Sequence, residues 1–138
     1  MKVLVVLLLT LLTPVVSTAE EADPFQGRLI PVELIMSERQ AIDLTKDQHR
    51  QIGKLVVDVQ QKVAGHQWEL TDAYFELLDA LDQETIDEEL AVSLVEQAVS
   101  LENKVKVEQV RLLVKVRNLL QPEQIAHLRS IIGTDGED

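Results

Sequence analysis

The chain has no cysteine among its 138 residues. It therefore forms no disulfide and offers neither a thiol nucleophile nor a thiolate ligand for a metal. Aromatic residues are scarce as well, at two Phe, one Trp and one Tyr, so the core must be aliphatic. Basic residues are outnumbered, with 13 Lys+Arg against 24 Asp+Glu. This balance excludes a basic surface for nucleic acid or for an anionic membrane.

Motifs of enzyme active sites are also missing. The sequence contains no Gly-rich phosphate loop and no Gly-x-Ser-x-Gly nucleophile elbow. Most carboxylates fall on the polar faces of predicted helices, where a solvated surface is their ordinary role. We predict that the protein is not an enzyme.

The longest apolar run lies at the N-terminus, over residues 3–16. Lys2 precedes the run, and the small residues Ser17, Thr18 and Ala19 follow it. This layout predicts a secretory signal peptide over residues 1–19, cleaved after Ala19. An uncleaved membrane anchor is the alternative, although the run is shorter than the roughly 20 residues that span a bilayer. Cleavage would leave 12 Lys+Arg against 24 Asp+Glu.

The rest of the chain is predicted to be one all-α domain of four helices. Residues 20–29 are polar and hold Pro24 and Gly27, which indicates a flexible lead-in. The helical domain spans residues 30–132, and residues 133–138 form a disordered tail. The predicted helices cover residues 31–42, residues 45–81, a third segment that follows a turn at 82–87 and ends near 120, and residues 122–132.

A pentapeptide at the start of the second helix predicts how that helix begins. Thr45 is placed to cap the helix by accepting a hydrogen bond from the backbone of Gln48, while the Gln48 side chain reaches back to Thr45. A related pentapeptide opens the fourth helix, with Pro122 at the first helical position, where a missing N–H costs nothing. The two copies read Leu44-Thr45-Lys46-Asp47-Gln48 and Leu120-Gln121-Pro122-Glu123-Gln124.

Apolar residues recur at steps of three and four along both long helices, which predicts that these helices pack against each other. At 1.5 Å per residue each helix would be on the order of 50 Å long, and a two-helix hairpin of that length has no interior of its own. We therefore predict a homodimer, since symmetric dimers are the commonest oligomers. The predicted contact series are Ile52, Val56, Val59, Val63, His66, Leu70, Ala73 and Leu77 on the second helix, and Ala91, Leu94, Ala98, Leu101 and Val105 on the third.

With these motifs the chain resembles the Spy/CpxP family of periplasmic chaperones and the related periplasmic heavy-metal sensors, which share paired LTxxQ motifs. The first motif is complete in Leu44, Thr45 and Gln48; the second keeps Leu120 and Gln124 but has Gln121 where the family has Thr. The proline-led segment at residues 30–36 is also similar, as are residues 67–70 and 117–120. The resemblance covers roughly residues 30–132.

The resemblance implies a long, bent antiparallel helical hairpin with short flanking helices, assembled as an antiparallel dimer in the periplasm. It further implies an ATP-independent chaperone, or holdase, that binds unfolded or misfolded proteins, or a modulator of the envelope stress response. The alternative is a heavy-metal sensor that regulates a partner in the inner membrane. Chaperones of this family carry positive charge on the binding surface, whereas this chain is acidic.

Three aromatic residues of the hairpin are the candidates for contact with unfolded clients. Trp68, Tyr74 and Phe75 would suit binding of low specificity if they were exposed. The alternative is that Trp68 and Phe75 pack beneath the short helices.

Histidines are the remaining candidates for chemistry. We predict no obligatory cofactor, but His49 and His127 each lie close to an LTxxQ-type motif and could meet if the hairpin brings both motifs to one end. A carboxylate such as Asp47 or Glu123 would then complete a site for zinc or another divalent transition metal. Two surface histidines are the simpler alternative. His66 lies on the apolar series, so we expect it to be a core-edge residue that hydrogen-bonds across the hairpin to Glu102 or Asn103, with pH sensing as the alternative.

Overall fold

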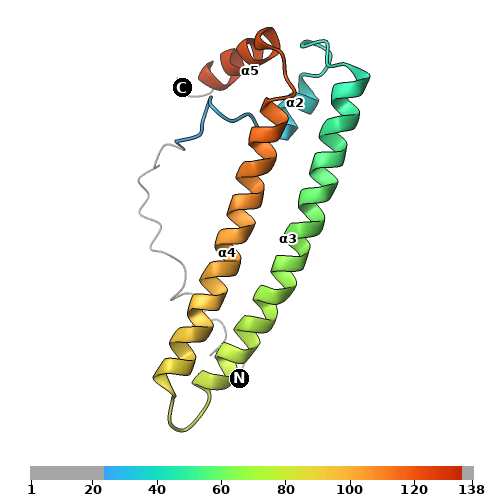
Figure 1. Ribbon diagram of the computed structural model, residues 1–138. Helices are drawn as coiled ribbons and strands as arrows, with labels where there is room; N and C mark the ends of the chain where they lie inside the picture. The colour runs from blue at the N-terminus through green and yellow to red at the C-terminus, as the bar shows by residue number, and fades with distance from the viewer. Residues whose placement is uncertain (1–23, 135–138) are drawn as a thin grey trace.

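The computed structural model describes residues 24–134, and this part of the chain is all-α, as predicted. Two long antiparallel helices form a hairpin, and two short helices lie at the end of the hairpin where its first long helix begins (Figure 1). The four helices are α2 (Val32–Ser37), α3 (Lys46–Leu81), α4 (Glu88–Arg117) and α5 (Pro122–Thr134). The predicted signal peptide lies outside the described residues, as does most of the predicted tail.

The long helices begin at side-chain caps, and the first of these caps was predicted from the sequence. Thr45 caps α3, its Oγ1 accepting from the backbone N–H of Gln48 at 3.0 Å, and the Gln48 side chain closes the capping box. Asp87 caps α4 by accepting from the N–H of Leu90 at 3.1 Å. With 36 residues, α3 is about 54 Å long. Because helix α4 ends at Arg117, it is three residues shorter than predicted.

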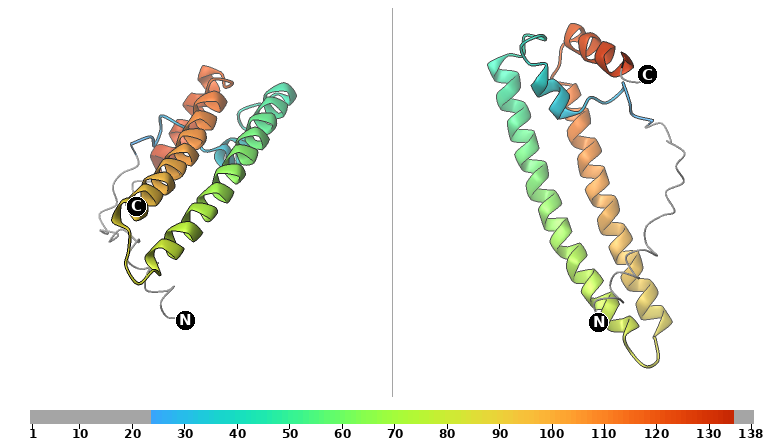
Figure 2. Two further views of the ribbon diagram at one scale, coloured as in Figure 1. Left: turned by 60° about the horizontal axis from the view of Figure 1, so that its bottom comes forward. Right: turned by 180° about the vertical axis from the view of Figure 1, so that it is seen from behind.

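The main hydrophobic core lies at one end of the hairpin, where α2 and α5 pack on the start of α3 and the end of α4 (Figures 1 and 2). Short helices have little apolar surface of their own, so they are held by burying it against both long helices at once. This arrangement places the two LTxxQ-type motifs side by side. The buried side chains are Ile30, Ile35, Ile42, Ile52, Val116, Leu120 and Leu128.

Beyond this end the hairpin consists of α3 and α4 alone within the described residues (Figure 2). The predicted contact series is confirmed, because each of its residues is buried or half-buried. A small second cluster near the turn is formed by Leu77, Ala80 and Leu94, with Tyr74, Leu81 and Ala91 packed on it. We call residues 63–103, the half of the hairpin that includes the turn, the arm.

The first short helix is shorter than predicted. Helix α2 ends at Ser37, and residues 38–43 continue as turns that close with Asp43 in the left-handed region at φ 50°. The N–H of Leu44 donates to Arg39 O and the N–H of Asp43 donates to Gln40 O, which is a Schellman termination. Here Asp takes the position that is usually Gly, so the sequence carries no obvious stop signal.

Residues 24–29, predicted as part of a flexible lead-in, form a hydrogen-bonded turn. The N–H groups of Arg28 and Leu29 both donate to Phe25 O at 2.9 Å. Arg129 of α5 donates to Gly27 O at 2.7 Å, which ties this turn to the helical end of the molecule. Helix α5 runs to Thr134, two residues into the predicted tail. No helix within residues 24–134 is both long enough and apolar enough to cross a membrane.

Candidate functional site: a glutamine junction and an exposed apolar face

The two LTxxQ-type motifs meet through their glutamines. Gln48 Nε2 donates to Gln124 Oε1 at 2.8 Å, and Gln124 Nε2 donates back to Gln48 Oε1 at 3.1 Å. Both side chains are buried. The residues lie 76 positions apart in sequence, so this pair joins the first turn of α3 to the first turn of α5.

Each glutamine side chain also hydrogen-bonds to the start of its own helix and to one more backbone carbonyl. Gln48 Oε1 accepts from the N–H of Thr45 at 3.0 Å, and Gln124 Oε1 accepts from the N–H of Gln121 at 2.8 Å. The second amide N–H of Gln48 donates to Leu119 O at 2.9 Å, and that of Gln124 donates to Ile42 O at 3.0 Å. Every hydrogen-bonding position of the two amides is thereby filled, which is what a buried polar pair needs to be stable. We call these two side chains and their partners the glutamine junction.

The junction explains how the second motif begins helix α5 without Thr at the N-cap. Gln121 supplies no side-chain cap, but its N–H is still satisfied by Gln124 Oε1. Glutamine is therefore the residue of the motif whose amide both caps its own helix and joins the two motifs. The sequence predicted the capping box at Thr45 and Gln48 but not this contact between motifs.

The histidines near the motifs have different neighbours. His127 Nε2 lies 3.2 Å from Glu38 Oε2, a carboxylate that the metal-site hypothesis did not include. His49 is exposed beside Arg39 and Asp43, and Asp47 is engaged by Arg50 and Gln51. Within residues 24–134 no group of three or more His, Asp or Glu side chains is arranged to hold a metal ion.

The expected hydrogen bond of His66 to Glu102 or Asn103 is wrong. The Nδ1 atom of His66 is buried without a hydrogen-bond partner. Glu102 instead accepts from the Tyr74 hydroxyl at 2.8 Å. That bond is the main reason why the pKa of Tyr74 is raised above its ordinary value, with partial burial and the Glu102 charge adding to it.

The aromatic residues proposed as client contacts are not packed beneath the short helices. Trp68 is 73% exposed and Phe75 is 63% exposed, both on the arm and away from α2 and α5. The alternative, packing of these two residues beneath the short helices, is therefore wrong. Tyr74 is half-buried against the cluster near the turn. The arm thus presents two bare aromatic rings in the part of the hairpin that has only two helices.

Exposed valines of α4 extend this surface. Val92, Val95 and Val99 follow one another at steps of three and four, so they form a second apolar stripe beside the one that packs on α3. Trp68 and Phe75 lie seven residues apart on α3 and opposite the residues that contact α4, so they point away from α4. The exposed apolar side chains of the arm therefore form one group on each helix, and together we call them the apolar face. They are Trp68, Phe75 and Leu78 on α3, and Val92, Val95 and Val99 on α4.

Charged side chains border the valine stripe of α4. Lys62 Nζ lies 3.0 Å from Asp58 and 3.9 Å from Glu108, and Arg111 Nη1 donates to Glu108 Oε1 at 2.6 Å. Val95 and Val99 line a groove with His66, Glu108 and Arg111. The stepping of these valines by three and four could have indicated the stripe from the sequence.

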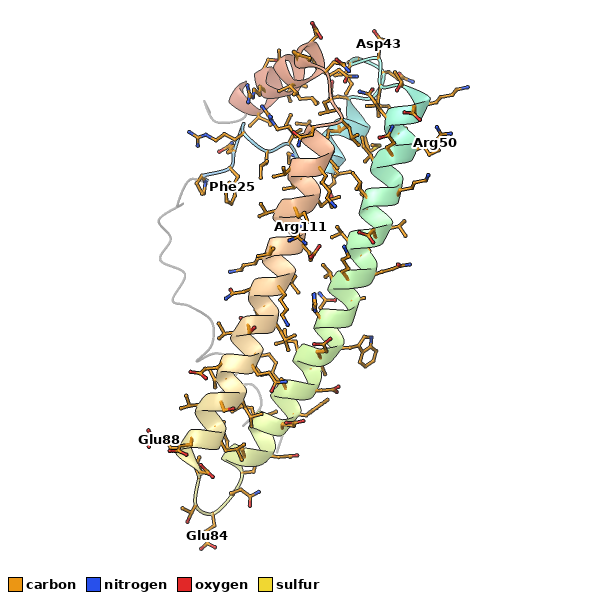
Figure 3. All side chains as sticks on the ribbon, viewed as in Figure 1. Phe25, Asp43, Arg50, Glu84, Glu88 and Arg111 are labelled. Carbon is orange, nitrogen blue, oxygen red and sulfur yellow. The ribbon has the colours of Figure 1, made fainter. Side chains whose placement is uncertain are left out.

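Charge is separated along the hairpin as well. The arm holds 11 Asp and Glu and no Lys or Arg, whereas the rest of residues 24–134 holds 12 Lys and Arg against 7 Asp and Glu. Figure 3 shows Glu84 and Glu88 at the turn, and Arg50 and Arg111 in the other half. The apolar face thus lies wholly in the part of the molecule that carries no basic side chain.

Comparisons of the chain with protein-family models, with curated proteins and with solved structures give no match.

Proposed function

We propose that the protein is an exported, periplasmic holdase of the Spy/CpxP type, or a stress-response modulator that uses the same surface, binding unfolded protein without ATP. The observation that carries the proposal is the apolar face of the arm, since clustered exposed apolar side chains are a common mark of interaction sites. The paired LTxxQ-type motifs, which meet in the glutamine junction, add the resemblance to that family.

The shape of the molecule supports this function. The short helices and the main core are gathered at one end, so the apolar face of the arm is free of them. Its side chains are mostly valines and aromatic rings, which contact varied sequences by shape and apolar surface rather than by directed hydrogen bonds. Two copies would double this surface, and the homodimer is part of the proposal. Sedimentation of the chain from Glu20 onward measures the oligomeric state directly.

Light scattering from an aggregating unfolded client tests the chaperone activity, with the mature chain in metal-free buffer. We expect suppression near stoichiometric ratios by the wild type and clear loss in Val95→Ser/Val99→Ser. The matched control is Val57→Ser/Val114→Ser, which changes two exposed valines of the long helices outside the arm and should keep the activity.

Equal activity of the two double variants would overturn the assignment to this face. No suppression by the wild type would overturn the chaperone function itself. If the inactive wild type instead gained stability in a saturable manner on adding zinc, the metal-responsive alternative and its membrane partner would become the better proposal.

A further inference from the structure

The apolar face of the arm alternates with acidic side chains on both helices. On α3 the order is Trp68, Asp72, Phe75 and Asp79, at steps of four and three, so rings and carboxylates share one stripe. On α4 the valine stripe is bounded by a carboxylate at each end. Its order is Glu88, Val92, Val95, Val99 and Glu102.

We propose that the α3 stripe of the apolar face binds cationic amphipathic polypeptide segments, whose apolar side chains cover Trp68 and Phe75 while their Lys and Arg side chains meet Asp72 and Asp79. The inference deepens the proposed function by naming the chemistry of the client, and it rests on the same face. It also makes the acidity of the chain, which departs from the family resemblance, part of the binding mechanism.

The negative charge of the arm favours a cationic partner. A field from 11 acidic side chains with no basic side chain among them attracts cations and repels anionic segments. Exposed aromatic rings add a second attraction, because the cationic groups of Lys and Arg are attracted to the faces of Trp and Phe. An apolar segment without charge gains neither term, so the face discriminates by charge as well as by hydrophobicity.

A second copy of the chain fits the face less well than a foreign cationic segment. The basic half of the molecule exceeds its own acids by only five, 12 against 7, so it would neutralise less than half of the arm. Several of its cations already have acidic neighbours, as in Lys62 with Asp58 and Arg111 with Glu108. Self-association through this face would therefore leave most of the acidic charge of the arm uncompensated.

The single tryptophan reports occupancy, because Trp68 lies on the face and is mostly exposed. We would titrate the mature chain with an amphipathic helical peptide of Leu and Lys, and separately with a peptide of the same pattern in which Glu replaces Lys. We expect a saturable blue shift of Trp68 emission with the Leu/Lys peptide, affinity at least about tenfold above that of the Leu/Glu peptide, and weakening as salt is added.

A pair of charge variants separates the face from the overall charge. Asp72→Asn/Asp79→Asn removes two carboxylates from the stripe of α3 and should weaken binding by about fivefold, from two exposed ion pairs. The control Glu33→Gln/Glu123→Gln removes two exposed carboxylates outside the arm and should bind as the wild type does.

Equal affinity for both peptides, or equal weakening in both variants, would overturn the inference. A Trp68 emission that shifts to the blue with protein concentration alone would also overturn it, in favour of a second copy on the face. Suppression of aggregation without preference between basic and acidic clients keeps the proposed function and overturns the charge selection. Peptide binding without suppression supports the inference and overturns the holdase function.

Discussion

Replacing Gln124 with Met removes the amide from the glutamine junction while keeping the volume of the side chain nearly unchanged. Four hydrogen bonds disappear: those from Gln121 N and Gln48 Nε2, and those to Ile42 O and Gln48 Oε1. At a net value of about 1 kcal/mol for each bond, the free energy of unfolding should fall by about 4 kcal/mol. That loss is a large fraction of the 5–15 kcal/mol that typically stabilises a domain.

Gln48→Met removes four side-chain bonds of the same kind, so it should cost a similar amount. Two of the four are the reciprocal bonds between the glutamines, and both single variants lose them. The double variant should therefore cost about 6 kcal/mol rather than 8, a coupling energy of about 2 kcal/mol.

Urea unfolding followed by far-ultraviolet circular dichroism measures these energies, at one fixed protein concentration so that any association contributes equally. Gln60→Met, at an exposed position of α3, is the control and should change the free energy of unfolding by less than about 0.5 kcal/mol. Single variants no worse than this control, or a coupling energy near zero, would refute the argument that the two motifs are joined by their glutamines.

Three further predictions concern the long helices. Gly53→Ala and Gly65→Ala should each raise the free energy of unfolding by about 1 kcal/mol, because both glycines are inside α3 with open space where a Cβ would lie; a loss in the same urea assay would contradict this. Asp87→Ala should lower it by about 1 kcal/mol through loss of the α4 cap, and Asp87→Ser should restore most of the loss. The pKa of Tyr74 is raised by Glu102, so its stabilising contribution is complete below the pKa of an unfolded tyrosine and is lost as pH rises through the folded value. Ultraviolet titration of this single tyrosine should show ionisation above the ordinary value, and Glu102→Gln should lower it.

Helix starts were predictable because their signals are local. Thr45 and Gln48 are three residues apart, and the capping box they form needs nothing beyond its own turn. The steps of three and four that define the contact between α3 and α4 are also local, so the buried series was predicted correctly. The end of α2 at Ser37 was not, because residues 38–42 contain no Gly or Pro to signal the change from helix to turns.

Contacts between residues that are distant in the sequence could not be predicted from it. The amide of Gln48 finds Gln124 only because α2 and α5 bury their apolar faces at the same end of the hairpin. The hydrogen bond predicted for His66 is wrong for a related reason. The sequence placed His66 and Glu102 at similar positions along the hairpin, but it could not show that Tyr74 is the residue that donates to this carboxylate. Exposure of Trp68 and Phe75 likewise depends on where the short helices pack.

The concentration of the core at one end has a consequence for the motions of the hairpin. Around the glutamine junction four helices bury large side chains, whereas along the arm small residues such as Ala73, Ala80 and Ala98 form much of the buried contact. Local opening should therefore cost least at the turn and most near the junction, so that amide hydrogen exchange slows progressively from Asp82 toward Ile52. A partner bound to the arm would meet two helices able to separate at their tips while the end that joins them stays closed.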